Sequence, residues 1–137
     1  NNAHGGGHVG GGKGNFTRYR FHLPIYNGLT SASIGVPTGA TVEVDPTNTN
    51  QNPAPILWYG TSIVNGHVAS RPGMIFTNTL SRMLDRPVIN LGFGGNGKME
   101  MAVGRLVVEV KQAAMIVIDC NWNMNGTTIA TNAPLLV

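Results

Sequence analysis

The sequence has little charge and almost no cysteine. Only 11% of its 137 residues are Asp, Glu, Lys or Arg, and Cys120 is the single cysteine. One cysteine excludes an intrachain disulfide framework. The nine basic residues give a formal net charge of +3, but they are scattered along the chain. A nucleic-acid-binding surface normally gathers basic residues with aromatic ones on one face, so we expect no nucleic-acid partner.

Long apolar runs are also missing. No stretch approaches the roughly 18 apolar residues that a membrane-spanning helix needs, and no signal-peptide pattern opens the chain. We therefore expect no membrane span. The first residue is Asn1 rather than Met, which indicates either a mature secreted product or an excised segment. A secreted or extracellular location is our expectation.

Glycine, in contrast, is abundant, and it is concentrated at the start. The chain has 19 glycines, and the first fourteen residues read NNAHGGGHVGGGKG. Ordering so many glycines costs much conformational entropy, which predicts a flexible tract. His4 and His8 are candidate metal ligands there, but a solvated glycine-rich loop is the more ordinary interpretation. We predict no metal and no cofactor.

The next part of the chain has strand character. Turn signals at Asn27-Gly28 and Pro37-Thr38-Gly39 separate short segments that are typical of antiparallel β-structure. These segments are Phe16–Pro24, Ser31–Val36 and Ala40–Val44. Three such strands form only a marginal unit, so we expect them to belong to a larger sheet. The polar residues 45–55 have the composition of a linker.

The second half alternates between strand and helix patterns. Apolar runs at 56–59, 88–91 and 115–119 predict three strands. Ser70 followed by Pro72 predicts a helix start, and Arg86-Pro87 predicts its end. Helical stripes between the strands are formed by Phe76, Leu80, Met83 and Leu84, and by Met99, Val103, Leu106 and Val110. This order favours a parallel sheet with right-handed crossovers.

Three polar or glycine-rich segments follow the three predicted strands. They are Gly60-Thr61-Ser62, Gly92–Gly97 and Asn121–Asn123. In parallel sheets, ligands bind at the carboxyl ends of the strands, so these segments should meet at one edge.

The middle segment permits two interpretations. Gly92–Gly97 matches G-x-G-x-x-G, and with Lys98 it matches most of a phosphate-binding loop. Such a loop needs Ser or Thr after the lysine to bind magnesium, and Met99 cannot do so. Dinucleotide fingerprints also follow the first strand of a unit rather than the second. Nucleotide binding is therefore the least favoured function.

Ser62 supports the other interpretation, acyl transfer. A serine after a strand is ordinarily a turn or helix-cap residue. It is not a G-x-S-x-G nucleophile elbow, because Val64 stands at the last glycine position. However, acyl transfer needs a nucleophile beside donors aimed at the developing oxyanion. A glycine N–H from the second segment and an Asn amide from the third would supply such donors.

These residues resemble a known family. The stretches PILWYGTSIVNG and ASRPGMIFTNTLSRMLDRPVINLGFGGNGKME are similar to a branch of the SGNH hydrolases, the GDSL-like lipases/acylhydrolases. In that branch a β-rich domain precedes the hydrolase domain, and FHLPIYNGLTSASIGVP resembles its last strands. The resemblance covers roughly residues 16–137. It implies the N-terminal half of a three-layer α/β/α flavodoxin-like hydrolase fold at 53–137, with the end of a β-rich domain and a linker at 1–52.

The resemblance also implies site residues. Ser62 is the expected nucleophile, and the oxyanion hole would be formed by Ser62, Gly95 and Asn123. Thr61 replaces the usual Asp of Gly-Asp-Ser-Leu, and Gly94 stands where Ser is common. The family's catalytic Asp and His lie on a later D-x-x-H segment, which these 137 residues do not contain. The missing C-terminal half of the domain is therefore an expected partner.

The other candidate residues have more ordinary interpretations. His67 is a candidate acyl-pocket residue or substitute base, although a loop histidine is more often only polar surface. Asn65 and Arg71 are candidate pocket residues, and bonding within their own loops is the more ordinary interpretation. Trp58 and Trp122 are expected to pack, with Trp122 also placed to line a pocket. Cys120 is expected to be a buried thiol.

Together these features predict a serine-dependent hydrolase of O-acyl esters. Acetyl esters on carbohydrate are the leading substrate, because β-rich domains often accompany such esterases. The alternatives are an acyltransferase on the same fold and a non-catalytic binding or structural protein, since fold alone does not establish function.

Overall fold

The computed structural model describes residues 17–44 and 54–136. Contacts divide the chain into two units, Asn1–Thr49 and Asn50–Val137, and each is described by itself. The glycine-rich tract at 1–14, with His4 and His8, lies outside the described residues, as does most of the predicted linker.

The strands predicted in the first unit are not present among residues 17–44. The turn after Pro37 is confirmed, because the Ala40 N–H donates to the Pro37 carbonyl at 2.9 Å. However, large apolar side chains remain exposed, among them Tyr19 at 75% and Val44 at 92%. Alternating apolar residues become strands only when a neighbouring strand accepts their hydrogen bonds. The β-rich domain expected here remains a prediction.

The three strands predicted in the second unit are confirmed. They are β1 (Ile56–Gly60), β2 (Val88–Gly92) and β3 (Met115–Asp119), all parallel, in the order β2-β1-β3. Central β1 is buried on both faces, as an apolar run in a parallel sheet should be.

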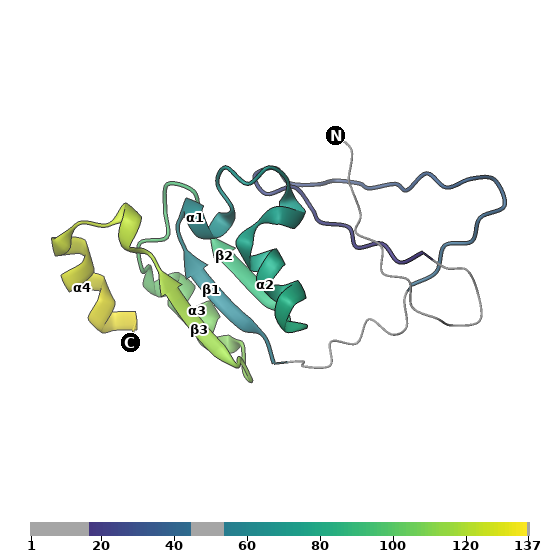
Figure 1. The fold of residues 1–137 in the computed structure, drawn as a ribbon. Helices are drawn as coiled ribbons and strands as arrows, with labels where there is room; N and C mark the ends of the chain where they lie inside the picture. Colours follow the sequence, from purple (N-terminus) through teal and green to yellow (C-terminus); the bar gives the residue numbers. More distant parts are fainter. Residues whose placement is uncertain (1–16, 45–53, 137) are drawn as a thin grey trace. The chain divides into compact units, whose positions relative to one another are not determined.

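Helices cover both faces of this sheet (Figure 1), which confirms the three-layer α/β/α arrangement. On one face lie α1 (Ser62–Asn65), η1 (Pro72–Met74) and α2 (Phe76–Leu84). On the other lies α3 (Met101–Glu109), whose Val107 joins the core of Leu57, Tyr59 and Cys120.

The helix starts and stripes differ in detail from the sequence prediction. Ser70 is not an N-cap, because η1 begins after Arg71 and α2 after Ile75. In α3, the predicted core residue Leu106 is 59% exposed, whereas Val107 is buried. The run of valines around Leu106 allows two apolar stripes, and only packing against the sheet selects one.

A fourth helix was not predicted. It is α4 (Gly126–Leu136), and it packs against α3. The Asn125 side chain accepts the Thr128 N–H at 2.9 Å, which is the geometry of an N-cap. Polar residues and Pro134 hide any apolar stripe in this segment, so periodicity could not reveal it.

Asn90 ties the sheet to the α1 and α2 layer. Its amide nitrogen donates to the Val64 carbonyl at 2.6 Å and to Thr77 Oγ1 at 2.9 Å. Its side-chain oxygen accepts the Gly92 N–H at 2.9 Å. These bonds fix the end of β2 against the turn that follows β1.

An open apolar groove of about 440 Å³ lies beside α2. Its lining residues are Trp58, Met74, Phe76, Thr79, Leu80 and Met83. The Trp58 ring packs edge-to-face on Phe76, which confirms the packing role predicted for Trp58. None of the predicted site residues lines the groove.

We expect the 137-residue chain alone to associate or aggregate. Large apolar side chains are more than half exposed on α2, on α3 and on the edge strand β3, among them Met83, Leu106, Val108 and Met115, and exposed apolar surface favours association. Light scattering and thermal denaturation of the isolated chain test this. A soluble monomer with a sharp cooperative transition would contradict it.

Candidate active site

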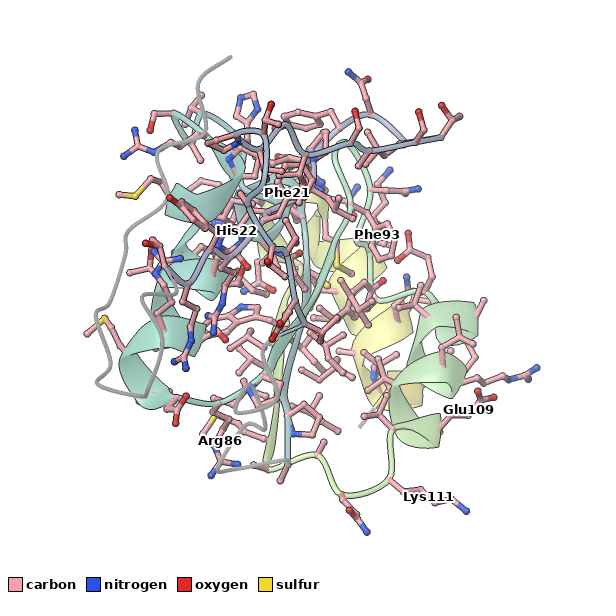
Figure 2. All side chains as sticks on the ribbon, turned by 90° about the vertical axis from the view of Figure 1, so that its right-hand side faces the viewer. Phe21, His22, Arg86, Phe93, Glu109 and Lys111 are labelled. Atoms are coloured by element: carbon pink, nitrogen blue, oxygen red, sulfur yellow. The ribbon has the colours of Figure 1, made fainter. Side chains whose placement is uncertain are left out.

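The predicted site residues all follow the carboxyl ends of the strands. Gly60 pairs in register with Gly92 on one side and with Asp119 on the other, so the three strands end level. Figure 2 shows Phe93, just after β2, at the opposite end of the sheet from Arg86 and Lys111, which precede β2 and β3. The convergence expected from a parallel sheet is therefore present.

Ser62 is the first residue of α1, directly after the turn at Thr61. The buried Thr61 caps the helix, and its hydroxyl accepts the Ile63 N–H at 3.4 Å. Ser62 is partly buried, and its carbonyl accepts the His67 N–H at 2.8 Å. The threonine that replaces the family's Asp therefore has a structural role, because it closes the turn that presents Ser62.

The loop after β2 lies directly against the turn that presents Ser62. The Phe93 N–H donates to the Gly60 carbonyl at 2.9 Å. A side chain on Gly97 would place its Cβ 2.2 Å from the Gly60 oxygen and 3.1 Å from the Thr61 nitrogen. Only glycine permits this backbone approach, and Gly97 also has a positive φ of 71°.

Gly95 lies at the tip of the same loop. The tip is a tight turn in which the Asn96 N–H donates to the Phe93 carbonyl at 3.1 Å. Gly95 is exposed, and an added Cβ would meet nothing within 4 Å, but its φ is also 71°. Glycine is required here for backbone conformation rather than for space.

Asn123 joins the third loop to the second. It ends η2 (Asn121–Asn123), and its side-chain nitrogen donates to the Asn96 carbonyl. A carboxamide nitrogen carries two hydrogens, so one bond to Asn96 leaves a second N–H for a ligand. Asn123 is therefore held beside the loop that contains Gly95.

Sequence reasoning missed a pair beneath this loop, formed by the buried Tyr59 and the partly buried Glu100. The Tyr59 hydroxyl, from a side chain that is 0% exposed, donates to the Glu100 carboxylate, and the Glu100 N–H donates back to it at 3.0 Å. Glu100 Oε2 also accepts the Lys98 N–H at 2.7 Å. The continuous apolar run at 56–59 indicated that Tyr59 belongs to a buried strand, but no local pattern indicated a partner 41 residues away.

These bonds set the charge states of the pair. Burial raises the pKa of Tyr59, and the hydrogen bond to Glu100 raises it further. Burial alone would raise the pKa of Glu100, but the hydrogen bonds from Tyr59 and from backbone N–H groups outweigh it, so the pKa lies below its usual value. The pair is therefore a neutral phenol bound to a carboxylate at neutral pH.

A lowered pKa for Glu100 makes its contribution to stability depend on pH. The contribution is present above the ordinary carboxyl pKa and is lost as the pH falls through the folded-state value. We expect Glu100→Gln to be less stable than wild type at pH 7, with the difference shrinking toward pH 3. Urea midpoints across that range measure it, and a pH-independent difference would contradict it.

The predicted pocket residues divide into two groups. The Asn65 amide donates to the Gly92 carbonyl at 3.2 Å, and its oxygen is buried without a partner among the described residues, so Asn65 holds the loops together. His67, Arg71 and Trp122 are exposed. The packing role expected for Trp122 is wrong, because its side chain is 76% exposed on the short η2 turn.

Cys120 is the buried thiol that the sequence predicted. It is 0% exposed at the end of β3, and burial raises its pKa above the usual value. A buried protonated thiol is a poor nucleophile, so Cys120 is a core residue and not a competitor of Ser62.

The glycine-rich loop is used for packing between strand ends. We therefore expect no rise in melting temperature when millimolar ATP and magnesium are added to the protein. Differential scanning fluorimetry with and without the nucleotide checks this. A saturable shift would favour nucleotide binding over acyl transfer.

In the described part of the chain, no group of three or more His, Cys, Asp or Glu side chains is arranged to hold a metal ion. Likewise, no helix within 17–44 or 54–136 is long and apolar enough to cross a membrane. The arrangement at the strand ends combines a serine hydroxyl with backbone and amide N–H groups. Chemically, it suits attack on an acyl carbon with donors for the resulting oxyanion.

Comparisons with known proteins support a hydrolase as the class of protein. No curated protein matches the chain. A solved structure described as that of a GDSL-like lipase from Bacteroides ovatus is similar, with 38% sequence identity and a TM-score of 0.58. The match covers 62% of this chain and 25% of that one, so it spans about a quarter of that protein's length. The family model of the GDSL-like lipases/acylhydrolases matches residues 53–137. The chain therefore belongs to the GDSL-like lipase/acylhydrolase family.

Proposed function

We propose that the complete protein is a serine-dependent hydrolase of O-acyl esters, with Ser62 as its nucleophile. The observation that carries the proposal is the bond from the Asn123 amide to the Asn96 carbonyl. It places an amide donor beside the Gly95 loop, which itself packs on the turn leading to Ser62. Family membership supports hydrolysis as the reaction class.

In the proposed mechanism, Ser62 Oγ attacks the acyl carbon while a base takes the hydroxyl proton. The N–H groups of Ser62, Gly95 and Asn123 stabilise the oxyanion. The alcohol leaves with the proton, and water then releases the acid from the acyl-enzyme.

The base is expected outside these 137 residues. Serine is a weak nucleophile without a base. The Bacteroides ovatus chain is about four times as long as the matched region. We propose that the complete protein carries the D-x-x-H segment in the C-terminal half of the same domain.

The proposed substrates are acetyl esters on carbohydrate. Two features support a small acyl group on a sugar. The apolar groove is lined by none of the site residues, so it does not extend the site for a long chain. The exposed Trp122 immediately precedes Asn123, and aromatic faces at such positions suit stacking on a sugar ring.

The test is hydrolysis by the complete protein. We expect release of p-nitrophenol from p-nitrophenyl acetate, little from the palmitate ester, and release of acetate from acetylated xylo-oligosaccharides. Adding a sugar acceptor distinguishes hydrolysis from acyl transfer, because a transferase would move acetyl to the acceptor. No turnover of any ester would instead favour a non-catalytic protein.

A further inference from the structure

Tyr59 contacts both ends of the loop that carries Gly95. The loop leaves β2 at Phe93, whose ring packs edge-to-face on the Tyr59 ring with centroids 6.0 Å apart. It ends at Glu100, which exchanges hydrogen bonds with the Tyr59 hydroxyl. One fully buried side chain of the central strand therefore holds the entrance and the exit of the loop.

The Glu100 carboxylate also binds a residue inside the loop. It accepts the Lys98 N–H at 2.7 Å, and the Lys98 carbonyl accepts from Asn132 of α4 at 2.7 Å. The peptide groups on both sides of Lys98 are thus fixed. Gly95 has no side chain of its own with which to hold its position, so the placement of its N–H depends on such anchors.

We propose that Tyr59 and Glu100 form a positioning pair that fixes the Gly95 N–H relative to Ser62. The proposal rests on the function proposed above. Tyr59 lies three residues before Ser62 on the same segment. The pair therefore attaches the loop that carries Gly95 to the same strand that leads to the nucleophile. Removing one oxyanion donor costs about 100- to 1000-fold in turnover, so loosening one should cost less than that.

The test compares four variants of the complete protein. Glu100→Ala removes the carboxylate, Glu100→Gln keeps an oxygen that accepts both bonds, and Tyr59→Phe keeps the ring but loses the hydroxyl. Glu109→Ala is the matched control, because Glu109 is an exposed glutamate at the far end of α3, remote from Phe93 in Figure 2.

Two readouts are needed, hydrogen exchange of the peptide spanning 93–99 and kinetics on p-nitrophenyl acetate. In Glu100→Ala we expect exchange of this peptide to rise about 10-fold or more. We expect kcat to fall by roughly 10- to 100-fold while KM changes less than about twofold. Glu100→Gln should recover most of both, and Glu109→Ala should match wild type.

Unchanged exchange in both Glu100→Ala and Tyr59→Phe would overturn the proposal. Faster exchange with an unchanged kcat would also overturn the proposal, because the pair would then order the loop without positioning the Gly95 N–H for catalysis. Should Glu100→Ala fail to fold, Tyr59→Phe decides, since it removes one hydroxyl from an intact core. If wild type hydrolyses no ester, the proposed function itself is wrong, and the exchange data then show only whether the pair orders the loop.

Discussion

Replacing Ser62 with Ala should abolish ester hydrolysis by the complete protein. Without Ser62 Oγ no acyl-enzyme forms, and the oxyanion donors alone retain only residual catalysis. We expect turnover of p-nitrophenyl acetate to fall to the background rate. Asn123→Ala keeps the nucleophile but loses one donor, which should cost on the order of 100- to 1000-fold in kcat.

The matched control for this experiment is Ser70→Ala. Ser70 is an exposed serine on the loop before η1, and its replacement should leave turnover unchanged. Mass spectrometry of the protein after reaction with a fluorophosphonate should show labelling of wild type and Ser70→Ala but not of Ser62→Ala. Undiminished turnover in Ser62→Ala would remove the nucleophile assignment.

Replacing Gly97 with Ala should strongly destabilise the site. The new Cβ would lie 2.2 Å from the Gly60 oxygen, and that oxygen belongs to the last residue of the central strand. A non-glycine residue with positive φ costs a further 1–2 kcal/mol or so. We expect the melting temperature of the complete protein to fall by roughly 5 °C or more. We also expect a loss of ester turnover, because the displaced loop carries Gly95.

Alanine substitutions at two other glycines of the loop distinguish the effect of backbone strain on the melting temperature from the effect of steric contact. Gly94→Ala should leave the melting temperature unchanged, because its Cβ would meet nothing within 4 Å and its φ is not positive. Gly95→Ala should show the cost of the positive φ alone, because its Cβ also meets nothing within 4 Å. Equal melting temperatures for all three variants would show that the contact between Gly97 and β1 is not tight in solution.

The sequence determined the parts of this protein that depend on local pattern. Short apolar runs followed by glycine or asparagine specified the three strands and the loops after them. Because parallel strands end at the same edge of a sheet, the sequence also predicted that Ser62, Gly95 and Asn123 lie at one edge. The lack of a hydroxyl at Met99 also made a phosphate-binding loop the least favoured interpretation of Gly92–Gly97.

Other features were decided only by contacts between distant segments. Strand character at 17–44 did not produce strands, because a strand needs a partner to bond. In α3, the sheet selected Val107 rather than Leu106 for the core. The pairing of Tyr59 with Glu100 joins residues 41 positions apart. Sequence periodicity records which side chains are apolar or polar, whereas the identity of each partner follows from how the layers pack in space.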